Sequence, residues 1–167
     1  MPVNDFDGDG TSDLAVYYVT GGSCNWYIRS LSMGTNLAFG VEWGSSDMLL
    51  VPGDYDGDGK SDLAAYEKTT GKWYIKTLAG ATIAWGESWG SPSMTPVWGD
   101  YDGDGSSDLA LFDVDAGSWY IYSLNNGVLA WATSWGWAGA VPVSGDYDGD
   151  GMTEVAMLEK SLSKLCL

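Results

Sequence analysis

Four short acidic segments carry the residues of this sequence that could bind a metal ion. They read DFDGDGTSD (5–13), DYDGDGKSD (54–62), DYDGDGSSD (100–108) and DYDGDGMTE (146–154), and we call them acidic loops 1 to 4. In a tight loop, the acids at positions 1, 3 and 5 converge, Gly at position 6 permits the sharp turn, and the acid at position 9 closes the shell. This all-oxygen set suits Ca²⁺, which takes roughly 6–8 oxygen ligands.

The sequence therefore predicts about four Ca²⁺ ions per chain, one for each acidic loop. Every predicted ligand is a side-chain carboxylate except at position 7, where the backbone carbonyl would supply the oxygen. In chain order, the predicted ligands are Asp5, Asp7, Asp9, Thr11 and Asp13; Asp54, Asp56, Asp58, Lys60 and Asp62; Asp100, Asp102, Asp104, Ser106 and Asp108; and Asp146, Asp148, Asp150, Met152 and Glu154.

The main competing interpretation of these loops is an EF-hand. That site needs a bidentate Glu at position 12 and a helix on each side. Position 12 is apolar in all four loops, and the flanking residues alternate as in strands. Two carboxylates about 4 Å apart repel by about 4 kcal/mol at an effective dielectric constant near 20, so such clusters need a cation to persist. We therefore expect structural calcium sites that each hold a hairpin.

The charge of the chain is concentrated in these loops. They hold 16 of the 23 acidic residues, and the seven other acids are balanced by seven Lys and Arg, which leaves a formal charge of −16. A nucleic-acid partner is not expected, because it would require a basic surface. The chain has no His, which excludes histidine-based triads. We expect no enzyme activity, because the remaining acids, Glu42, Asp47 and Glu87 among them, form no convincing pair for glycoside hydrolysis.

The loops belong to a longer internal repeat. They start at residues 5, 54, 100 and 146, a spacing that is typical of propeller blades. A WYI strand recurs at 26, 73 and 119, and Trp-Gly pairs recur at 43, 89 and 135. We predict a single repeat domain over 1–167, with repeats at about 1–47, 48–93, 94–139 and 140–167, the last one partial.

Each repeat reads as four short strands, and no stretch shows a sustained helical period. The first strand precedes each acidic loop, the second follows it, the third begins at the WYI segment, and the fourth ends at the Trp-Gly pair. The predicted fold is all-β, with about three and a half four-stranded antiparallel β-propeller blades per chain. Because open blade faces would be apolar, we expect a homodimer or another homo-oligomer to close a ring of seven or eight blades.

The runs GDYDGDGKSDLAAY (53–66) and GDYDGDGSSDLALF (99–112) closely resemble FG-GAP/VCBS repeats. These are the calcium-loop blades of the integrin α-subunit propeller, and they also occur in secreted bacterial proteins and some fungal lectins. The resemblance covers roughly residues 1–159, with Trp-Gly where many members have Phe-Gly. It implies a β-propeller with Ca²⁺ bound between the first two strands of each blade, and extracellular recognition of proteins or glycans.

Three aromatic residues, Phe39, Trp85 and Trp131, occupy equivalent positions four residues before the Trp-Gly pairs. They could stack on sugars as a ligand-binding set or pack between sheets in the core. The leading functional prediction is a calcium-binding module for extracellular recognition or adhesion. A glycan-binding lectin of the same fold is the alternative, and a part of a polysaccharide-degrading protein is a third interpretation.

The remaining expectations concern cysteines and location. Cys24 and Cys166 fall in different repeats, so free thiols, one intramolecular bridge and an intermolecular bridge all remain open. No signal peptide is expected at the start of this sequence, and no run of about 18 apolar residues predicts a membrane span. The calcium sites themselves favour an extracellular location, because free calcium is scarce in the cytosol.

Overall fold

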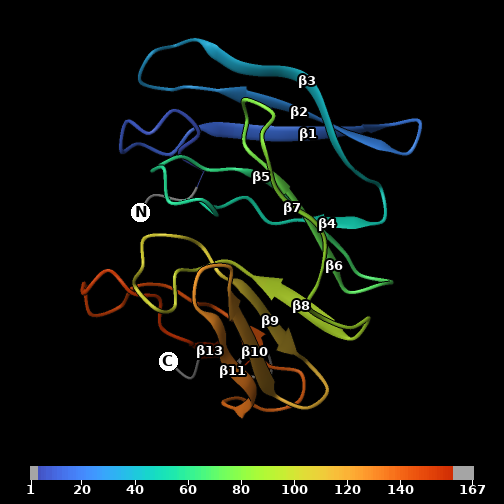
Figure 1. Ribbon diagram of the computed structural model, residues 1–167, viewed down its shortest axis with the longest axis vertical. Coiled ribbons are helices and arrows are strands. Elements are labelled where there is room, and N and C mark those ends of the chain that lie inside the picture. The colour runs from blue at the N-terminus through green and yellow to red at the C-terminus, as the bar shows by residue number, and fades with distance from the viewer. Residues whose placement is uncertain (1–3, 160–167) are drawn as a thin grey trace, which may run out of the picture.

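A computed structural model describes residues 4–159, and this part of the chain contains β-strands and no helix. Blades 1 to 3 are antiparallel sheets in which strands that follow one another in sequence pair with one another. Figure 1 shows them one after another along the long axis of the molecule. The strands are β1 (Leu14–Thr20), β2 (Ser23–Arg29) and β3 (Asn36–Ser45) in blade 1; β4 (Met48–Leu50), β5 (Leu63–Glu67), β6 (Lys72–Lys76) and β7 (Thr82–Ser88) in blade 2; β8 (Met94–Val97), β9 (Leu109–Asp113), β10 (Ser118–Ser123) and β11 (Gly127–Ser134) in blade 3; and β12 (Val141–Pro142) and β13 (Met157–Leu158) in the partial blade 4.

This arrangement confirms the prediction of an all-β fold built from antiparallel blade-like sheets. Blades 2 and 3 have the expected four strands, with an acidic loop joining the first strand to the second. In blade 4, the strand expected after the acidic loop is short, and only its residues Met157 and Leu158 pair with β12. The bridge between Gly145 and Glu154 still closes the base of acidic loop 4.

The core consists of three apolar layers, one at each contact between successive blades. Trp26 and Ile28 of blade 1 pack with Leu63 of blade 2 in the first layer. Trp73 of blade 2 shares the second layer with Leu109 and Leu111 of blade 3, and blade 3 packs against blade 4 in the third. Strands β5 and β9 are buried on both faces, as expected for sheets that lie between two others.

A buried tryptophan fixes the third strand of each of the first three blades. Trp26, Trp73 and Trp119 are almost completely buried. Their indole N–H groups donate hydrogen bonds to the backbone carbonyls of Trp43, Trp89 and Trp135, at 3.0, 2.8 and 2.8 Å respectively. The WYI tryptophans are therefore core residues, and the carbonyl of each Trp-Gly pair is the acceptor that satisfies them.

Candidate metal centres

The first aspartate of each acidic loop organises the loop backbone. Both carboxylate oxygens of Asp5 accept hydrogen bonds, Oδ1 from Gly8 N–H at 2.7 Å and Oδ2 from Gly10 N–H at 2.8 Å. The first aspartates of loops 2, 3 and 4 accept the two corresponding bonds. The backbone of each loop therefore folds around this carboxylate, which accepts two of its N–H groups. This explains why an acid occurs at position 1 in every repeat.

Glycines at positions 4 and 6 give the loops their left-handed backbone. In loop 1, Gly8 has a φ of 78° and Gly10 a φ of 86°. The glycines at these positions in the other three loops have φ values between 73° and 93°. A side chain with a Cβ rarely adopts this conformation, so the DGDG sequence meets a backbone requirement. Position 6 was expected from the sequence, and position 4 was not.

The acid at position 9 closes each loop at its base. In loop 1, Oδ2 of Asp13 accepts a hydrogen bond from the backbone N–H of Phe6 at 2.8 Å. The same bond joins positions 9 and 2 in loops 2 and 3. In loop 4, Glu154 takes this place and accepts from the N–H of Tyr147 at 2.7 Å. The longer side chain of Glu154 thus makes the same hydrogen bond as the aspartates of the other loops.

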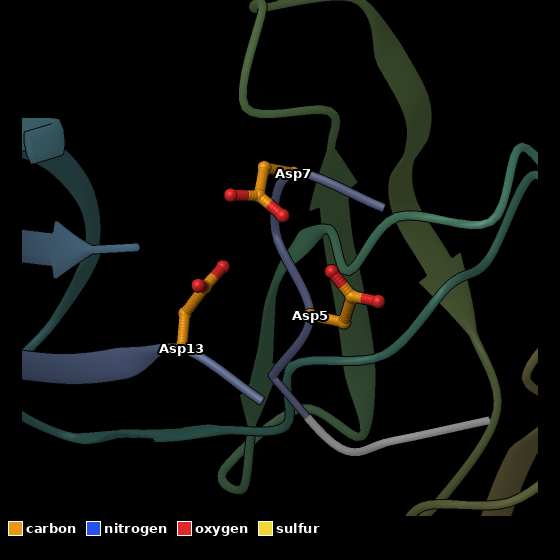
Figure 2. Close-up of side chains that lie close together, drawn as sticks. All are labelled: Asp5, Asp7 and Asp13. Atoms are coloured by element: carbon orange, nitrogen blue, oxygen red, sulfur yellow. The ribbon is translucent and has the colours of Figure 1, made fainter. Parts of the chain in front are cut away.

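Each acidic loop brings three of its predicted ligands close enough to share a metal ion. One oxygen from each of the three carboxylates lies within 4.8 Å of the other two. In Figure 2, Asp7 from the loop and Asp13 at the start of β1 direct their carboxylates toward the same space. The groups consist of positions 1, 3 and 9 in loops 1, 3 and 4, and of positions 1, 3 and 5 in loop 2: Asp5, Asp7, Asp13; Asp54, Asp56, Asp58; Asp100, Asp102, Asp108; and Asp146, Asp148, Glu154.

Two of these carboxylates contain a buried oxygen without a hydrogen-bond partner. They are Oδ2 of Asp7 in loop 1 and Oδ1 of Asp108 in loop 3. Leaving a buried polar atom unsatisfied costs about 1–3 kcal/mol, and more for a charged group. A cation among the three carboxylates would satisfy both atoms. The donor set contains only oxygen, so the residues fit a hard divalent ion such as Ca²⁺.

The position-5 acids of loops 1 and 3 make other contacts. Asp9 accepts a hydrogen bond from the hydroxyl of Ser32 in the β2–β3 turn, and this bond lowers the pKa of Asp9. Oδ2 of Asp104 accepts from the side-chain amides of Asn125 and Asn126, at 2.9 and 3.1 Å, in the β10–β11 turn. These turn residues were not expected at the site, because nothing in their local sequence indicates that they reach an acidic loop.

The other predicted ligands are placed as follows. Asp62 in loop 2 and Asp150 in loop 4 lie outside the three-carboxylate groups, although both are in the loops as expected. The position-7 carbonyls of Thr11, Lys60, Ser106 and Met152 stay predicted ligands.

Burial and repulsion from neighbouring carboxylates raise the pKa values of the closing acids of loops 2 and 3. Burial is the main cause that raises the pKa of Asp62 to about 7 and the pKa of Asp108 to about 7. The neighbouring carboxylates of the same loop raise both pKa values further. The hydrogen bond from the N–H at position 2 opposes the shift only in part. Without a cation, these two sites therefore disfavour their own negative charge.

The four loops lie together on one side of the molecule. In Figure 1 they are on the left, and the β1–β2 and β5–β6 turns extend to the right. A single cavity of about 440 Å³ is lined by residues of all four loops. The first aspartates Asp5, Asp54, Asp100 and Asp146 all line this cavity, together with Trp98. The stacking of the blades thus gathers the acidic loops around one space.

The three equivalent aromatics lie on the surface. Phe39, Trp85 and Trp131 are 78, 71 and 68 % exposed, so the core-packing interpretation is wrong for them. Each ring stands at 82–87° to a tyrosine of the neighbouring strand, with ring centroids 5.1–5.4 Å apart. Trp85 also meets Trp43 of the preceding blade at 5.9 Å. The set therefore forms a recurring row of exposed rings on β3, β7 and β11.

Two further expectations can be compared with the structure. Cys24 is a buried free thiol whose Sγ donates a hydrogen bond to the carbonyl of Ser45. Cys166 lies outside the described residues, so its state stays open. Residues 4–159 contain no helix that is long and apolar enough to cross a membrane.

Comparison with known proteins gives one match. No curated protein and no solved structure matches the chain. The family described as FG-GAP-like repeat matches residues 54–111. This segment begins at the first aspartate of acidic loop 2 and ends within β9, so it contains loops 2 and 3 and strands β5 to β8. Residues 54–111 are therefore an FG-GAP-like repeat segment, which confirms the family that the resemblance of these runs had indicated.

Proposed function

We propose that this chain is a calcium-stabilised β-propeller module for extracellular recognition or adhesion, with one structural Ca²⁺ in each acidic loop. The observation that carries the proposal is the recurrence of three carboxylates within 4.8 Å of one another in all four loops. The buried oxygens of Asp7 and Asp108 that lack a partner add support. The FG-GAP-like family is generally non-catalytic, and we propose no reaction for this chain.

The proposed role of the loops is to hold the first two strands of each blade together. The bound ion would supply positive charge that offsets the repulsion among the loop carboxylates. The acid at position 1 fixes the loop backbone, and the acid at position 9 fixes the loop to the start of the second strand. Because the closing acids of loops 1 to 3, Asp13, Asp62 and Asp108, are buried, a change in their charge acts directly on blade stability.

Calorimetry tests this proposal. Isothermal titration of EDTA-treated, dialysed protein should give about four Ca²⁺ per chain. Melting should occur at a sharply higher temperature in Ca²⁺ than in EDTA, because a ligand that binds only the folded state stabilises it. Mg²⁺ should stabilise less, since it dehydrates reluctantly and demands a stricter geometry. An unchanged melting temperature in excess EDTA would refute the calcium assignment.

A glycan ligand is the second candidate, and the exposed aromatic row specifically favours it. Large aromatic rings on a surface offer apolar faces on which sugar rings can stack. Binding should be measured on a glycan array with the wild type, Trp85→Ala and Trp131→Ala. Trp137→Ala is the matched control, because Trp137 is exposed but lies outside the row. Loss of binding in the first two variants and retention in the control would support a lectin, whereas equal binding in all four proteins would refute it.

A further inference from the structure

Successive acidic loops are joined by one backbone hydrogen bond that recurs three times. The N–H at position 8 of one loop donates to the carbonyl at position 1 of the preceding loop. The three bonds are Ser61 to Asp5 at 2.6 Å, Ser107 to Asp54 at 2.5 Å and Thr153 to Asp100 at 2.6 Å. Every junction between neighbouring loops in the described part of the chain therefore has the same donor and the same acceptor.

At each end of this series of loops, one of the two hydrogen-bonding groups lacks its partner among the described residues. Among residues 4–159, no acceptor is found for the N–H of Ser12, the position-8 residue of loop 1. In the same part of the chain, no backbone N–H donates to the carbonyl of Asp146 in loop 4. The first loop thus presents the donor of a further junction, and the last loop presents its acceptor.

The position-4 glycines show the same pattern. A Cβ built on Gly57 would lie 2.9 Å from Oγ of Ser106, and one on Gly103 would lie 2.9 Å from Cγ of Met152. In each case the position-7 side chain of the next loop covers the glycine. Gly149 of loop 4 has no atom within 4 Å of the corresponding point. Among residues 4–159, the surface of loop 4 at Gly149 therefore lacks the neighbouring side chain that covers the same glycine in loops 2 and 3.

Blade 1 also has one apolar face that no other blade covers among residues 4–159. Leu63 and Ala65 on β5 face blade 1 and are 0 % exposed, as are Leu109 and Leu111 on β9. Their counterparts on β1 are Leu14 and Val16, which are 54 and 53 % exposed. Burying apolar area contributes about 25 cal/mol per Å², so this open face favours an occupant.

The last blade exposes the complementary half of the same contact. Tyr55 at position 2 of loop 2 is 2 % exposed, whereas its counterpart Tyr147 in loop 4 is 64 % exposed. Tyr66 and Phe112 are completely buried against the following blade, whereas Leu158 at the same position of blade 4 is exposed. The open face of blade 4 thus carries the same types of residue that cover β5 and β9, the strands equivalent to β1 in blades 2 and 3.

We propose that the open face of blade 4 binds the open face of blade 1 of a second copy of this chain, head to tail. In this junction the Ser12 N–H of one copy donates to the Asp146 carbonyl of the other, and Leu14 and Val16 pack against Tyr147 and Leu158. The occupant is a second copy because both halves of the required surface are already present on this chain. The inference deepens the proposed function, since it identifies the partner that completes the propeller.

The two contacting faces differ, so the interface is heterologous. Repeating it must either close the copies into a ring or extend them into an open filament. The intrachain junctions already turn successive blades around a common cavity, which favours closure. Two copies would close into a ring with eight acidic loops and two identical new junctions. Both open faces of both copies are then covered, and no apolar blade face remains in contact with water.

The mass in solution and three glutamate variants test this arrangement. By analytical ultracentrifugation, we expect the calcium-loaded wild type to have twice the 17.8 kDa mass of one chain. Val16→Glu places a charge in the blade 1 half of the junction, and Leu158→Glu places one in the blade 4 half, so each variant alone should be a monomer. Val128→Glu is the matched control, because Val128 is exposed to a similar extent on the outer strand β11. It should remain a dimer.

Mixing the two monomeric variants distinguishes head-to-tail packing from other dimers. One Val16→Glu chain and one Leu158→Glu chain retain one complete junction between them, so the mixture should form a 1:1 complex. A dimer of Leu158→Glu alone, or a calcium-loaded monomeric wild type at tens of micromolar, would overturn the inference. Mass that grows with concentration beyond two chains would overturn ring closure. Calcium titration of each variant separates these results from the proposed function, because a monomer that still binds about four Ca²⁺ leaves that function intact.

Discussion

Replacing Asp108 by Asn should have opposite effects on stability with and without calcium. Asp108 closes acidic loop 3, where its Oδ2 accepts the Tyr101 N–H at 2.7 Å and its Oδ1 has no partner. Asparagine has nearly the same shape and can retain the carbonyl acceptor for Tyr101. The substitution therefore removes one negative charge from a group that also contains Asp100 and Asp102, and changes little else.

The size of the effect follows from the spacing of these carboxylates. Oxygens of Asp108, Asp100 and Asp102 lie within 4.8 Å of one another. At that separation, a pair of unit charges repels by about 1 kcal/mol in water and by about 3 kcal/mol at an effective dielectric constant of 20. Without calcium, the variant should be more stable by about 1–3 kcal/mol. For a chain of this length, this corresponds to a rise in melting temperature of about 2–12 °C.

Calcium should reverse this order. At a free concentration of 100 Kd, one site stabilises the folded state by about 2.7 kcal/mol, and the variant loses much of that contribution at loop 3. Calorimetric melts in EDTA and in Ca²⁺ measure both effects, with Asp115→Asn as the control, because Asp115 is an exposed acid outside the loops. A variant that is less stable than the wild type in EDTA would refute the electrostatic reasoning and leave Asp108 a simple hydrogen-bond acceptor.

Two further predictions concern pH and the core. Because the pKa values of Asp62 and Asp108 are raised to about 7, the folded calcium-free protein holds protons between pH 4 and 7 that the unfolded chain has released. Its stability should fall as pH rises through this range, while calcium affinity should rise, and melts at several pH values in EDTA and Ca²⁺ will measure both. Trp73→Phe leaves the buried Trp89 carbonyl without its donor and should cost about 1–3 kcal/mol in urea unfolding, whereas the exposed Trp85→Phe should cost almost nothing.

The strands and the loops were predictable because both have strong local signals. Each acidic loop contains its own organising acid and its own glycines, so the turn is encoded within nine residues. The burial of Trp73 and Trp119 follows from their place in a strand with apolar residues on both faces. The family match over 54–111 supports the repeat that carries these signals.

Other features depend on contacts between distant parts of the chain and gave no local signal. Asn125 and Asn126 reach Asp104 only because the β10–β11 turn folds back toward loop 3. Phe39, Trp85 and Trp131 have the composition of core residues, yet they lie on outer strands where no following sheet covers them. Their exposure could not be inferred from residue type, because an apolar residue is buried only where a neighbour is present to cover it.

The recurring bond between position 8 and position 1 has a consequence for how such chains change in length. Each repeat carries both the donor and the acceptor, and the position-4 glycines of loops 1 to 3 contact the position-7 side chain of the next loop in the same way. Inserting or deleting one 46-residue unit within the series would therefore leave every remaining junction chemically intact. Stability then grows by the addition of nearest-neighbour contacts, as in other repeat proteins. Duplication or deletion of one blade can thus lengthen or shorten the protein without requiring a new interface.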